Sequence, residues 1–338
     1  MTREASQKQR QRPSRSRKRG DVAPTQQSVA APHGRDGTIL SSDRIDLNLT
    51  MITPTDPAPS SVETVIPGRF VALLYHDVHP GNAFDYGRLG ESATLYHVSE
   101  PVFRAHLDVI DNTGVQCLDD DAIHACLAGR GKAGAAGLVL CFDDGWNGAV
   151  ECAAPVLAER RLPAFFFITT GLVGRRFFAG AAALRRLDPL LFTVGSHGVT
   201  HRMLSGLRPD DIRAELCDSR RALEDLLGRP VACLSVPGGA VSRRVVEIAE
   251  EAGYTSLFTS AIGMNPMPGG YRCIARIGVR RGTDPTTLQR WVSGDLRRER
   301  VRAALLDIPK RMLGARAYSK LRRVLLGDAF GREHFFEP

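Results

Sequence analysis

The chain of 338 residues is long enough for one large domain with tails or for two domains of ordinary size. Its composition, 43% hydrophobic, 24% charged and 7% aromatic, is that of a globular protein and excludes collagen-like, wholly disordered and multi-span membrane classes. The net charge of +8 is concentrated in residues 1–20 and in the segment from Leu296 onward, so residues 67–295 are close to neutral and nucleic acid is not an expected partner of the folded body.

Residues 1–66 are rich in Gln, Ser, Pro, Asp and Arg and contain few apolar side chains. Such a segment cannot bury enough apolar surface to offset the entropy lost on ordering. We therefore expect a disordered basic leader, and a solvated tail is favoured over an arm that binds an anionic surface or nucleic acid.

From Arg69 onward, short apolar runs alternate with amphipathic segments that carry helix start and stop signals. The predicted strands are Phe70–Tyr75, Val115–Leu118, Leu138–Phe142, Ala164–Thr169, Phe192–Gly195, Ala232–Val236, Thr255–Thr259 and Cys273–Val279. The predicted helices begin near Ser99, Asp119, Asn147, Pro209, Ser242 and Pro285. This alternation predicts an α/β fold over residues 67–295, namely a (β/α) barrel, complete or distorted, with seven or eight strands. A doubly wound open sheet is the alternative.

Polar residues follow four of the predicted strands, at the barrel end where chemistry is expected. They are Tyr75-His76-Asp77, Asp143-Asp144-Gly145, the segment from His197 to His201, and Pro237-Gly238-Gly239. Two adjacent carboxylates directly after a buried run are costly unless a cation compensates their charge. An Asp with two His four residues apart leaves coordination positions open, which is typical of a catalytic metal site.

The motifs FDDG, SHxxxH and PGG, in this order, resemble those of the NodB-type polysaccharide deacetylases, carbohydrate esterase family 4, over roughly residues 70 to 290. The resemblance implies a metal-dependent hydrolase that removes acetyl groups from N-acetylated amino sugars. It implies Asp143 as general base, and Asp144, His197 and His201 as ligands of a divalent ion, expected to be zinc. It also implies the Gly238 N–H, beside Pro237 and Gly239, as a donor to the oxyanion.

The proton for the leaving amine comes, in that family, from a Leu-x-His motif near the end of the domain, and the last predicted strand has no histidine. Leu74-Tyr75-His76 supplies the pattern at the first strand, which a closed barrel places beside the last. This resembles the circularly permuted exopolysaccharide deacetylases and implies His76 as the general acid. A packing or capping role for His76, with His79 as substitute, is the alternative.

The family's third motif usually begins with an Arg that orients the base, but Ser235 occupies that position here. Arg276 on the last predicted strand is our candidate for the missing cation. The alternative is that Arg276 belongs to a solvated basic cluster with Arg272, Arg280 and Arg281. Gly198 likewise replaces a hydroxyl residue, which Thr200 could supply.

Two aromatic features follow the predicted strands. Trp146 either forms part of a wall on which a sugar stacks or packs over the barrel mouth. The loop from His79 to His97 carries Phe84, Tyr86 and Tyr96 and is long for a βα connection, so we expect it to influence substrate specificity.

Residues 296–338 combine apolar and basic residues at helical spacing. A basic amphipathic helix can lie on an anionic membrane or on a partner, or it can pack on the barrel with its cations extended to water. The seven cysteines form no CxxC pair, which indicates reduced thiols. Since neither a membrane span nor a signal-peptide core is evident, we expect a cytoplasmic protein, peripheral to the inner membrane face if the tail binds lipid.

The sequence thus predicts a deacetylase acting on a polysaccharide, an oligosaccharide or a glycolipid precursor, with exopolysaccharide biosynthesis as the expected setting. Two other functions stay open. One is a metal amidase that acts on another small acylamide. The other is a carbohydrate-binding protein that has the fold without turnover.

Overall fold

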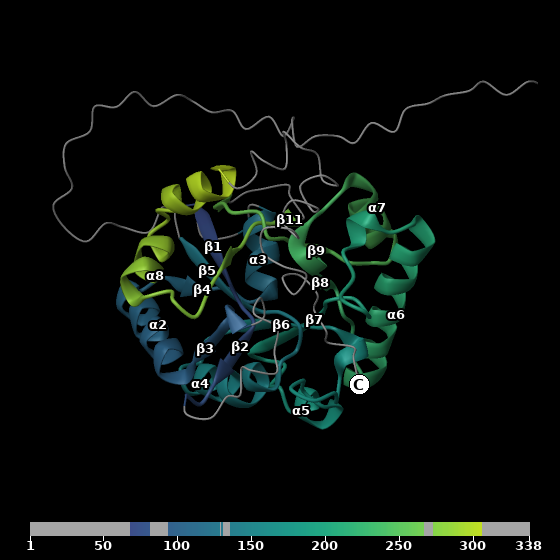
Figure 1. The fold of residues 1–338 in the computed structure, drawn as a ribbon, viewed down its shortest axis with the longest axis horizontal. Coiled ribbons are helices and arrows are strands. Elements are labelled where there is room, and N and C mark those ends of the chain that lie inside the picture. The colour runs from purple at the N-terminus through teal and green to yellow at the C-terminus, as the bar shows by residue number, and fades with distance from the viewer. Residues whose placement is uncertain (1–67, 82–93, 129, 131–135, 267–272, 306–338) are drawn as a thin grey trace, which may run out of the picture. The chain divides into compact units, whose positions relative to one another are not determined.

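A computed structural model describes residues 68–81, 94–128, 130, 136–266 and 273–305. The expected leader, most of the expected tail, and Phe84 and Tyr86 lie outside the described residues. Figure 1 shows the described elements, with helices arranged around a central group of strands. Among these elements, no helix has the length and apolarity needed to cross a bilayer.

Six parallel strands form most of a barrel. They pair in the order β1 (Arg69–Tyr75), β5 (Gly137–Phe142), β6 (Ala164–Ile168), β7 (Phe192–Ser196), β8 (Cys233–Ser235) and β9 (Ser256–Phe258). Each corresponds to a predicted strand. Because both faces of these strands are covered, their residues are apolar with little alternation, as in other parallel sheets.

The barrel closes through one chain segment. β11 (Cys273–Ile274) pairs with β9, and β12 (Ile277–Gly278) pairs with β1, so the segment reaches from one end of the strand order to the other. Asn265 of β10 (Asn265–Pro266) supports the closure, because its side-chain amide donates to the Ala275 carbonyl (2.9 Å) and its carbonyl accepts from Ala275 N–H (2.8 Å). The predicted barrel is confirmed in its distorted form.

The second predicted strand is not a full barrel strand. β4 (Gln116–Cys117) pairs only with Gly137 and Leu138 at the start of β5, whereas β6 pairs with the end of β5. The chain then enters α3 (Asp120–Leu127), where Asp119 caps the helix by accepting from Ala122 N–H (2.8 Å).

Helix α3 fills the amino end of the barrel. Its buried Ile123 and Cys126 belong to the apolar cluster formed by the inward-facing side chains of the strands. Cys233 Sγ, at the start of β8, lies 3.1 Å from Asp120 Oδ1, which places α3 against the amino ends of the strands. The opposite, carboxyl end is therefore the end at which the predicted site residues lie.

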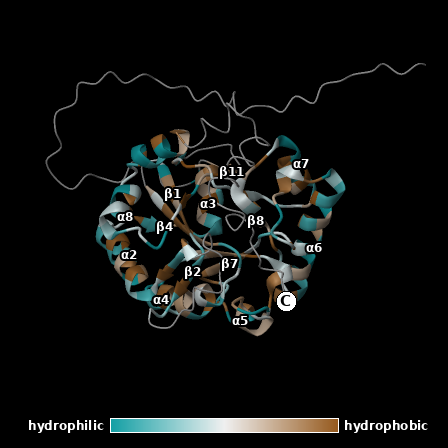
Figure 2. Ribbon diagram, viewed as in Figure 1, coloured by the Kyte–Doolittle hydropathy of each residue, from teal (hydrophilic) through white to brown (hydrophobic). Residues whose placement is uncertain are grey.

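Amphipathic helices cover the outside of the strands, and in Figure 2 helices α2 and α6 carry both hydrophobic and hydrophilic stretches. Gly114 and Gly228 end these two helices in left-handed backbone, as expected of C-terminal glycines. The helices are α2 (Glu100–Thr113), α4 (Ala154–Glu159) preceded by the π-helix η2 (Ala149–Ala153), α5 (Ala181–Arg185), α6 (Pro209–Leu227), α7 (Arg243–Glu251) and α8 (Pro285–Val292).

A small second sheet was not predicted. β2 (Asp77–His79) and β3 (His97–Ser99) pair in parallel, one at each end of the long loop expected from His79 to His97. Each strand has three residues, too few for a periodic pattern to indicate it. β2 follows His76 directly, so this sheet begins beside the site.

Candidate active site

The carboxyl ends of adjacent strands bring the predicted residues together. Asp143 follows β5, and its N–H donates to the carbonyl of Tyr75 at the end of β1 (3.1 Å). His197 follows β7, and its N–H donates to the carbonyl of Ile168 at the end of β6 (2.8 Å). Residues 54 positions apart in the chain therefore meet at one edge.

Asp143 is held from the barrel interior by Arg276. The guanidinium donates from Nη1 to Oδ1 (2.8 Å) and from Nη2 to Oδ2 (2.9 Å), a bidentate pair in which both side chains are buried. Ser235 joins them, since its hydroxyl accepts from Arg276 Nη2 (2.8 Å) and donates to Asp143 Oδ2 (3.0 Å). The arginine missing from the PGG motif is thus replaced in space by Arg276, with Ser235 as a bridge.

The surroundings of Arg276 fix its position. Its Nε donates to the Thr259 carbonyl (2.8 Å), and its guanidinium carbon lies 5.8 Å and 5.9 Å from the ring centroids of Phe167 and Phe258. Burial alone raises the pKa of Asp143, but the charge of Arg276 and then of His197 outweighs it, so the pKa lies below its ordinary value. Asp143 is therefore a fixed carboxylate.

Asp144 meets both histidines. Its Oδ1 lies 3.3 Å from His197 Nε2 and 3.2 Å from His201 Nε2, and one ligand atom from each residue lies within 4.8 Å of the others. His197 Nδ1 donates to the Ser235 carbonyl (2.7 Å), which leaves Nε2 with its lone pair directed toward the cluster. The three residues that we predicted as ligands therefore converge.

The donor set fits a divalent ion. Asp144 Oδ1 is buried and has no hydrogen-bond partner among the described residues, whereas Oδ2 accepts from Trp146 Nε1 (3.0 Å). A buried carboxylate oxygen without a donor is costly unless a cation meets it. One carboxylate and two imidazoles form a ligand set found in catalytic zinc sites.

Backbone strain is concentrated here. Four non-glycine residues of the described chain have positive φ, and three of them, Asp144 (73°), His201 (58°) and Phe177 (72°), lie in loops at the carboxyl end of the barrel. Left-handed backbone is uncommon for residues other than glycine and often occurs at functional sites. Two of these three residues, Asp144 and His201, belong to the three-residue cluster.

Glu215 of α6 holds the loop between the two histidines, and the sequence analysis did not find it. Its carboxylate accepts from Val199 N–H (2.7 Å), from Thr200 N–H (2.9 Å) and from the Thr200 hydroxyl. The hydroxyl that we expected from Thr200 is thus directed to Glu215. Gly198 (φ 77°) packs against the carboxylate, because an added Cβ would lie 3.1 Å from Oε2. An isolated Glu in an amphipathic helix gives no sequence signal for this position.

His76 lies at the end of β1, half-buried, with its ring centroid 4.6 Å from that of Tyr96. Burial lowers the pKa of His76, and the charges of Asp144 and Asp143 oppose that effect. Tyr75 pairs with Phe142, so His76 and Asp143 follow the ends of neighbouring strands. His76 Nδ1 has no hydrogen-bond partner among the described residues. His79, the substitute, lies in β2, where its Nδ1 accepts from Gly81 N–H (3.2 Å).

Trp146 packs under the site rather than offering a surface to a sugar. Its side chain is 1% exposed, and its ring lies 4.5 Å from Phe178 and 4.6 Å, edge-on, from His97. His97 is in turn paired with buried Asp77 (2.9 Å). Stacking on a pyranose needs an open ring face, so the sugar-wall alternative for Trp146 is wrong in this structure. The indole orients Asp144 instead.

The PGG turn forms a 3-10 turn, η5 (Pro237–Gly239), after β8. Gly238 and Gly239 both have positive φ (66° and 69°). The Gly239 N–H donates to the Val236 carbonyl (2.7 Å) and is thereby committed to the turn. The oxyanion role of Gly238 stays a prediction.

The arginines of the expected basic cluster do not share one environment. Arg276 is buried on Asp143, whereas Arg280 and Arg281 are exposed and Arg272 lies outside the described residues. A solvated cluster that includes Arg276 is therefore wrong.

Comparison with known proteins finds a family model that matches the part of the chain that carries this site. Residues 130–257 match the family model described as "Polysaccharide deacetylase", a range that includes both aspartates and both histidines. The Bacillus subtilis protein YxkH, which is named as a polysaccharide deacetylase, is 22% identical over 227 residues, covering 67% of this chain and 77% of its own.

Solved structures share the fold. The Streptococcus pyogenes deacetylase PplD, in complex with acetate, is similar with a TM-score of 0.58 and 22% identity, covering 66% of this chain and 97% of its own. IcaB from Ammonifex degensii is similar with a TM-score of 0.58 and 23% identity, covering 68% of this chain and 100% of its own.

Proposed function

We propose that this chain is a polysaccharide deacetylase, a hydrolase of non-peptide C–N bonds, and that it removes acetyl groups from N-acetylated amino sugars with the help of a divalent ion. The substrate is a polysaccharide, an oligosaccharide or a glycolipid precursor. The convergence of Asp143 on Arg276, beside the Asp144, His197 and His201 cluster, carries the proposal.

Asp143 is the base that takes a proton from the attacking water. Its Oδ2 lies 3.8 Å from His197 Nε2, so this oxygen borders the three-residue cluster. Arg276 and Ser235 fix the plane of the carboxylate and keep it ionised. A positioned base of this kind contributes about 10² to 10⁴ in rate.

Asp144, His197 and His201 would hold the ion, which we propose to be zinc. A zinc ion bound there polarises the acetamide carbonyl and lowers the pKa of water. The protein's part is to fix the ligands, and it does so through the Ser235 carbonyl on His197, Trp146 on Asp144 and Glu215 on the histidine loop.

His76 donates a proton to the departing amine. The end of β1 places it beside Asp143, and the Tyr96 ring restricts its orientation. The Gly238 N–H contributes to binding the oxyanion. Exopolysaccharide biosynthesis is the setting that we propose, from the resemblance of the segment Leu74-Tyr75-His76 to that of the exopolysaccharide deacetylases.

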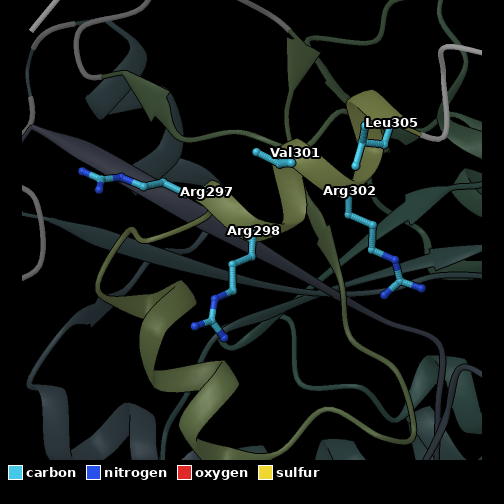
Figure 3. A pocket seen from close by; sticks show the side chains of 5 residues that line it. All are labelled: Arg297, Arg298, Val301, Arg302 and Leu305. Atoms are coloured by element: carbon cyan, nitrogen blue, oxygen red, sulfur yellow. The ribbon is translucent and has the colours of Figure 1, made fainter.

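We also propose that the protein is cytoplasmic and lies at the inner membrane face. Residues 297–305 are helical, and Val301 and Leu305, one turn apart, are 59% and 60% exposed. Figure 3 shows these two with Arg297, Arg298 and Arg302, which line a shallow cavity of about 560 Å³. Exposed apolar side chains flanked by arginines match the surface of an anionic bilayer.

Co-sedimentation with vesicles tests the membrane proposal. The full chain should bind vesicles rich in phosphatidylglycerol and not neutral vesicles, and a chain ending at Leu296 should lose this binding. Val301→Asp with Leu305→Asp should weaken it in the full chain. Equal binding by the full and shortened chains would overturn this part of the proposal.

Acetate release tests the catalytic proposal. The purified protein is incubated with N-acetylated chitooligosaccharides, with and without a chelator, and compared with Asp143→Asn and His76→Ala. We expect chelator-sensitive release that falls sharply in both variants. Metal binding without turnover on a broad panel of acylated substrates would instead support the carbohydrate-binding alternative.

A further inference from the structure

Exposed charge at the open end of the barrel is mainly positive. Within the described loops that follow β6, β7 and β12, exposed arginines outnumber exposed carboxylates, of which Asp284 is one, and the site carboxylates Asp143 and Asp144 are buried. We call five of these arginines the arginine rim: Arg175, Arg176, Arg202, Arg280 and Arg281.

The loops of the arginine rim are tied to the site. Phe177, next to Arg176, accepts through its carbonyl from Asn147 N–H beside the aspartate turn (2.8 Å). Thr170 N–H of the same loop donates to the Gly198 carbonyl in the histidine loop (3.0 Å), which leads to Arg202. The loops that carry Arg176 and Arg202 are therefore hydrogen-bonded to the loops that carry the site residues.

Four arginines of the rim form no ion pair within the described residues, namely Arg175, Arg176, Arg202 and Arg280. By contrast, Arg208 at the start of α6 and Arg213, Arg220 and Arg221 within it each pair with a carboxylate three or four positions away. Inside the site, Arg276 already pairs with Asp143. An approaching ligand therefore meets positive charge first.

Arg280 lies near the reaction centre. Its guanidinium carbon is 5.9 Å from the ring centroid of Tyr96, and that ring is 4.6 Å from the ring of His76. A substituent of the sugar that reaches past Tyr96 would meet this guanidinium, whose planar group of donors suits a carboxylate or a phosphate.

We infer that the site selects N-acetylated glycans carrying an anionic group, a carboxylate or a phosphate, close to the acetylated sugar, with Arg280 and Arg202 as the recognising cations. The inference rests on the proposed function and narrows its substrate class. It makes the arginine rim a determinant of specificity and leaves the chemistry to the buried residues.

Binding to the metal-free protein tests the inference apart from activity. Titration calorimetry compares neutral N-acetylchitotetraose with a hyaluronan tetrasaccharide, which carries carboxylates, and with N-acetylglucosamine 1-phosphate. We expect one of the acidic probes to bind at least about tenfold more tightly than the neutral one at low salt, with the gap narrowing as salt is raised. The tighter probe identifies the source of the anionic group.

The variant Arg202→Gln/Arg280→Gln should remove most of the difference in affinity between the acidic and the neutral probe, and its affinity for the neutral probe should be unchanged. Arg221→Gln, an exposed residue of α6, is the matched control and should change neither. In kinetics on the acidic substrate, the double variant should raise KM and leave kcat unchanged.

Equal affinity for neutral and acidic probes, or an equal loss on both in the double variant, would overturn the inference. Acetate release from the neutral chitooligosaccharide would in that case still support the proposed function. Conversely, tighter binding of an acidic probe without release of acetate from any substrate would support the anionic specificity and contradict the deacetylase.

Discussion

Two consecutive carboxylates of one turn have opposite surroundings. Asp143 faces the barrel interior, where Arg276 and Ser235 satisfy both of its oxygens. Asp144 faces the histidine loop, where one oxygen accepts from Trp146 and the other, buried, has no donor among the described residues. Asp144 has a positive φ, and its side chain has different partners from that of Asp143.

The difference separates two kinds of chemistry. A carboxylate that its own chain has paired keeps a constant charge and position, which suits a base. A buried carboxylate oxygen without a donor, beside two imidazoles, suits an external cation. In this turn, the hydrogen-bond partners of Asp143 all come from the protein, whereas Asp144 has an oxygen that is suited to binding a ligand ion.

The largest expected effect comes from replacing Asp143 and Asp144 one at a time. Asp143→Asn should lower kcat by about 10² to 10⁴, because the base is lost, and should leave zinc affinity within a few-fold of the parent. Asp144→Asn should instead abolish zinc binding, measured by calorimetry, and activity with it. Similar losses of zinc affinity in both variants would show that the two carboxylates do not have separate roles.

The next effect concerns stability. Arg276→Leu leaves Asp143 buried without its cation, which should cost about 3 to 5 kcal/mol of the free energy of unfolding. Arg160→Leu, which breaks surface pairs with Asp108 and Asp111, should cost about 1 kcal/mol or less for each pair. Urea denaturation measures both.

A second variant sharpens the Arg276 prediction. In Asp143→Leu/Arg276→Leu no unpaired charge is left in the interior, so stability should recover relative to Arg276→Leu alone. If the double variant loses as much unfolding free energy as the two single variants added together, the predicted coupling between Asp143 and Arg276 is contradicted.

The sequence alone predicted much of this site, because its motifs lie at strand ends. Strand runs such as Leu138–Phe142 are apolar and end in charged residues, so their position at the carboxyl edge followed from the barrel. We predicted a role for Arg276 because Ser235 occupies the position at which the resemblance requires an arginine. Its bidentate contact with Asp143 came from the structure.

Other features had no local signal. Glu215 is one acidic residue in a long amphipathic helix, and only the tertiary packing of α6 directs it to the histidine loop. The sheet of β2 and β3 is too short to show periodicity. Trp146 allowed two interpretations because sequence does not report exposure, and its burial against Phe178 excluded one of them.

A smaller effect tests how Asp144 is oriented. Trp146→Phe removes the N–H that binds Oδ2 and should weaken zinc affinity by about 10- to 100-fold, the usual cost of losing such a support. Trp291→Phe is the matched control, because Trp291 is also buried but its Nε1 has no hydrogen-bond partner in the described part of the chain. Both variants should lose similar stability, and only Trp146→Phe should change zinc affinity.

The smallest effect tests the support of the histidine loop. Glu215→Gln keeps the shape of the side chain but exchanges charged acceptors for an amide, which should weaken the bonds from Val199 and Thr200 and cost about 1 kcal/mol. Because this loop positions His201, zinc affinity should fall several-fold. Glu224→Gln, on the same helix and bonded to Val231 N–H, should lower stability alone. If the unfolding temperature and the zinc affinity change equally in the two variants, Glu215 supports only the fold. The ion site would then depend on the strand ends and not on the histidine loop.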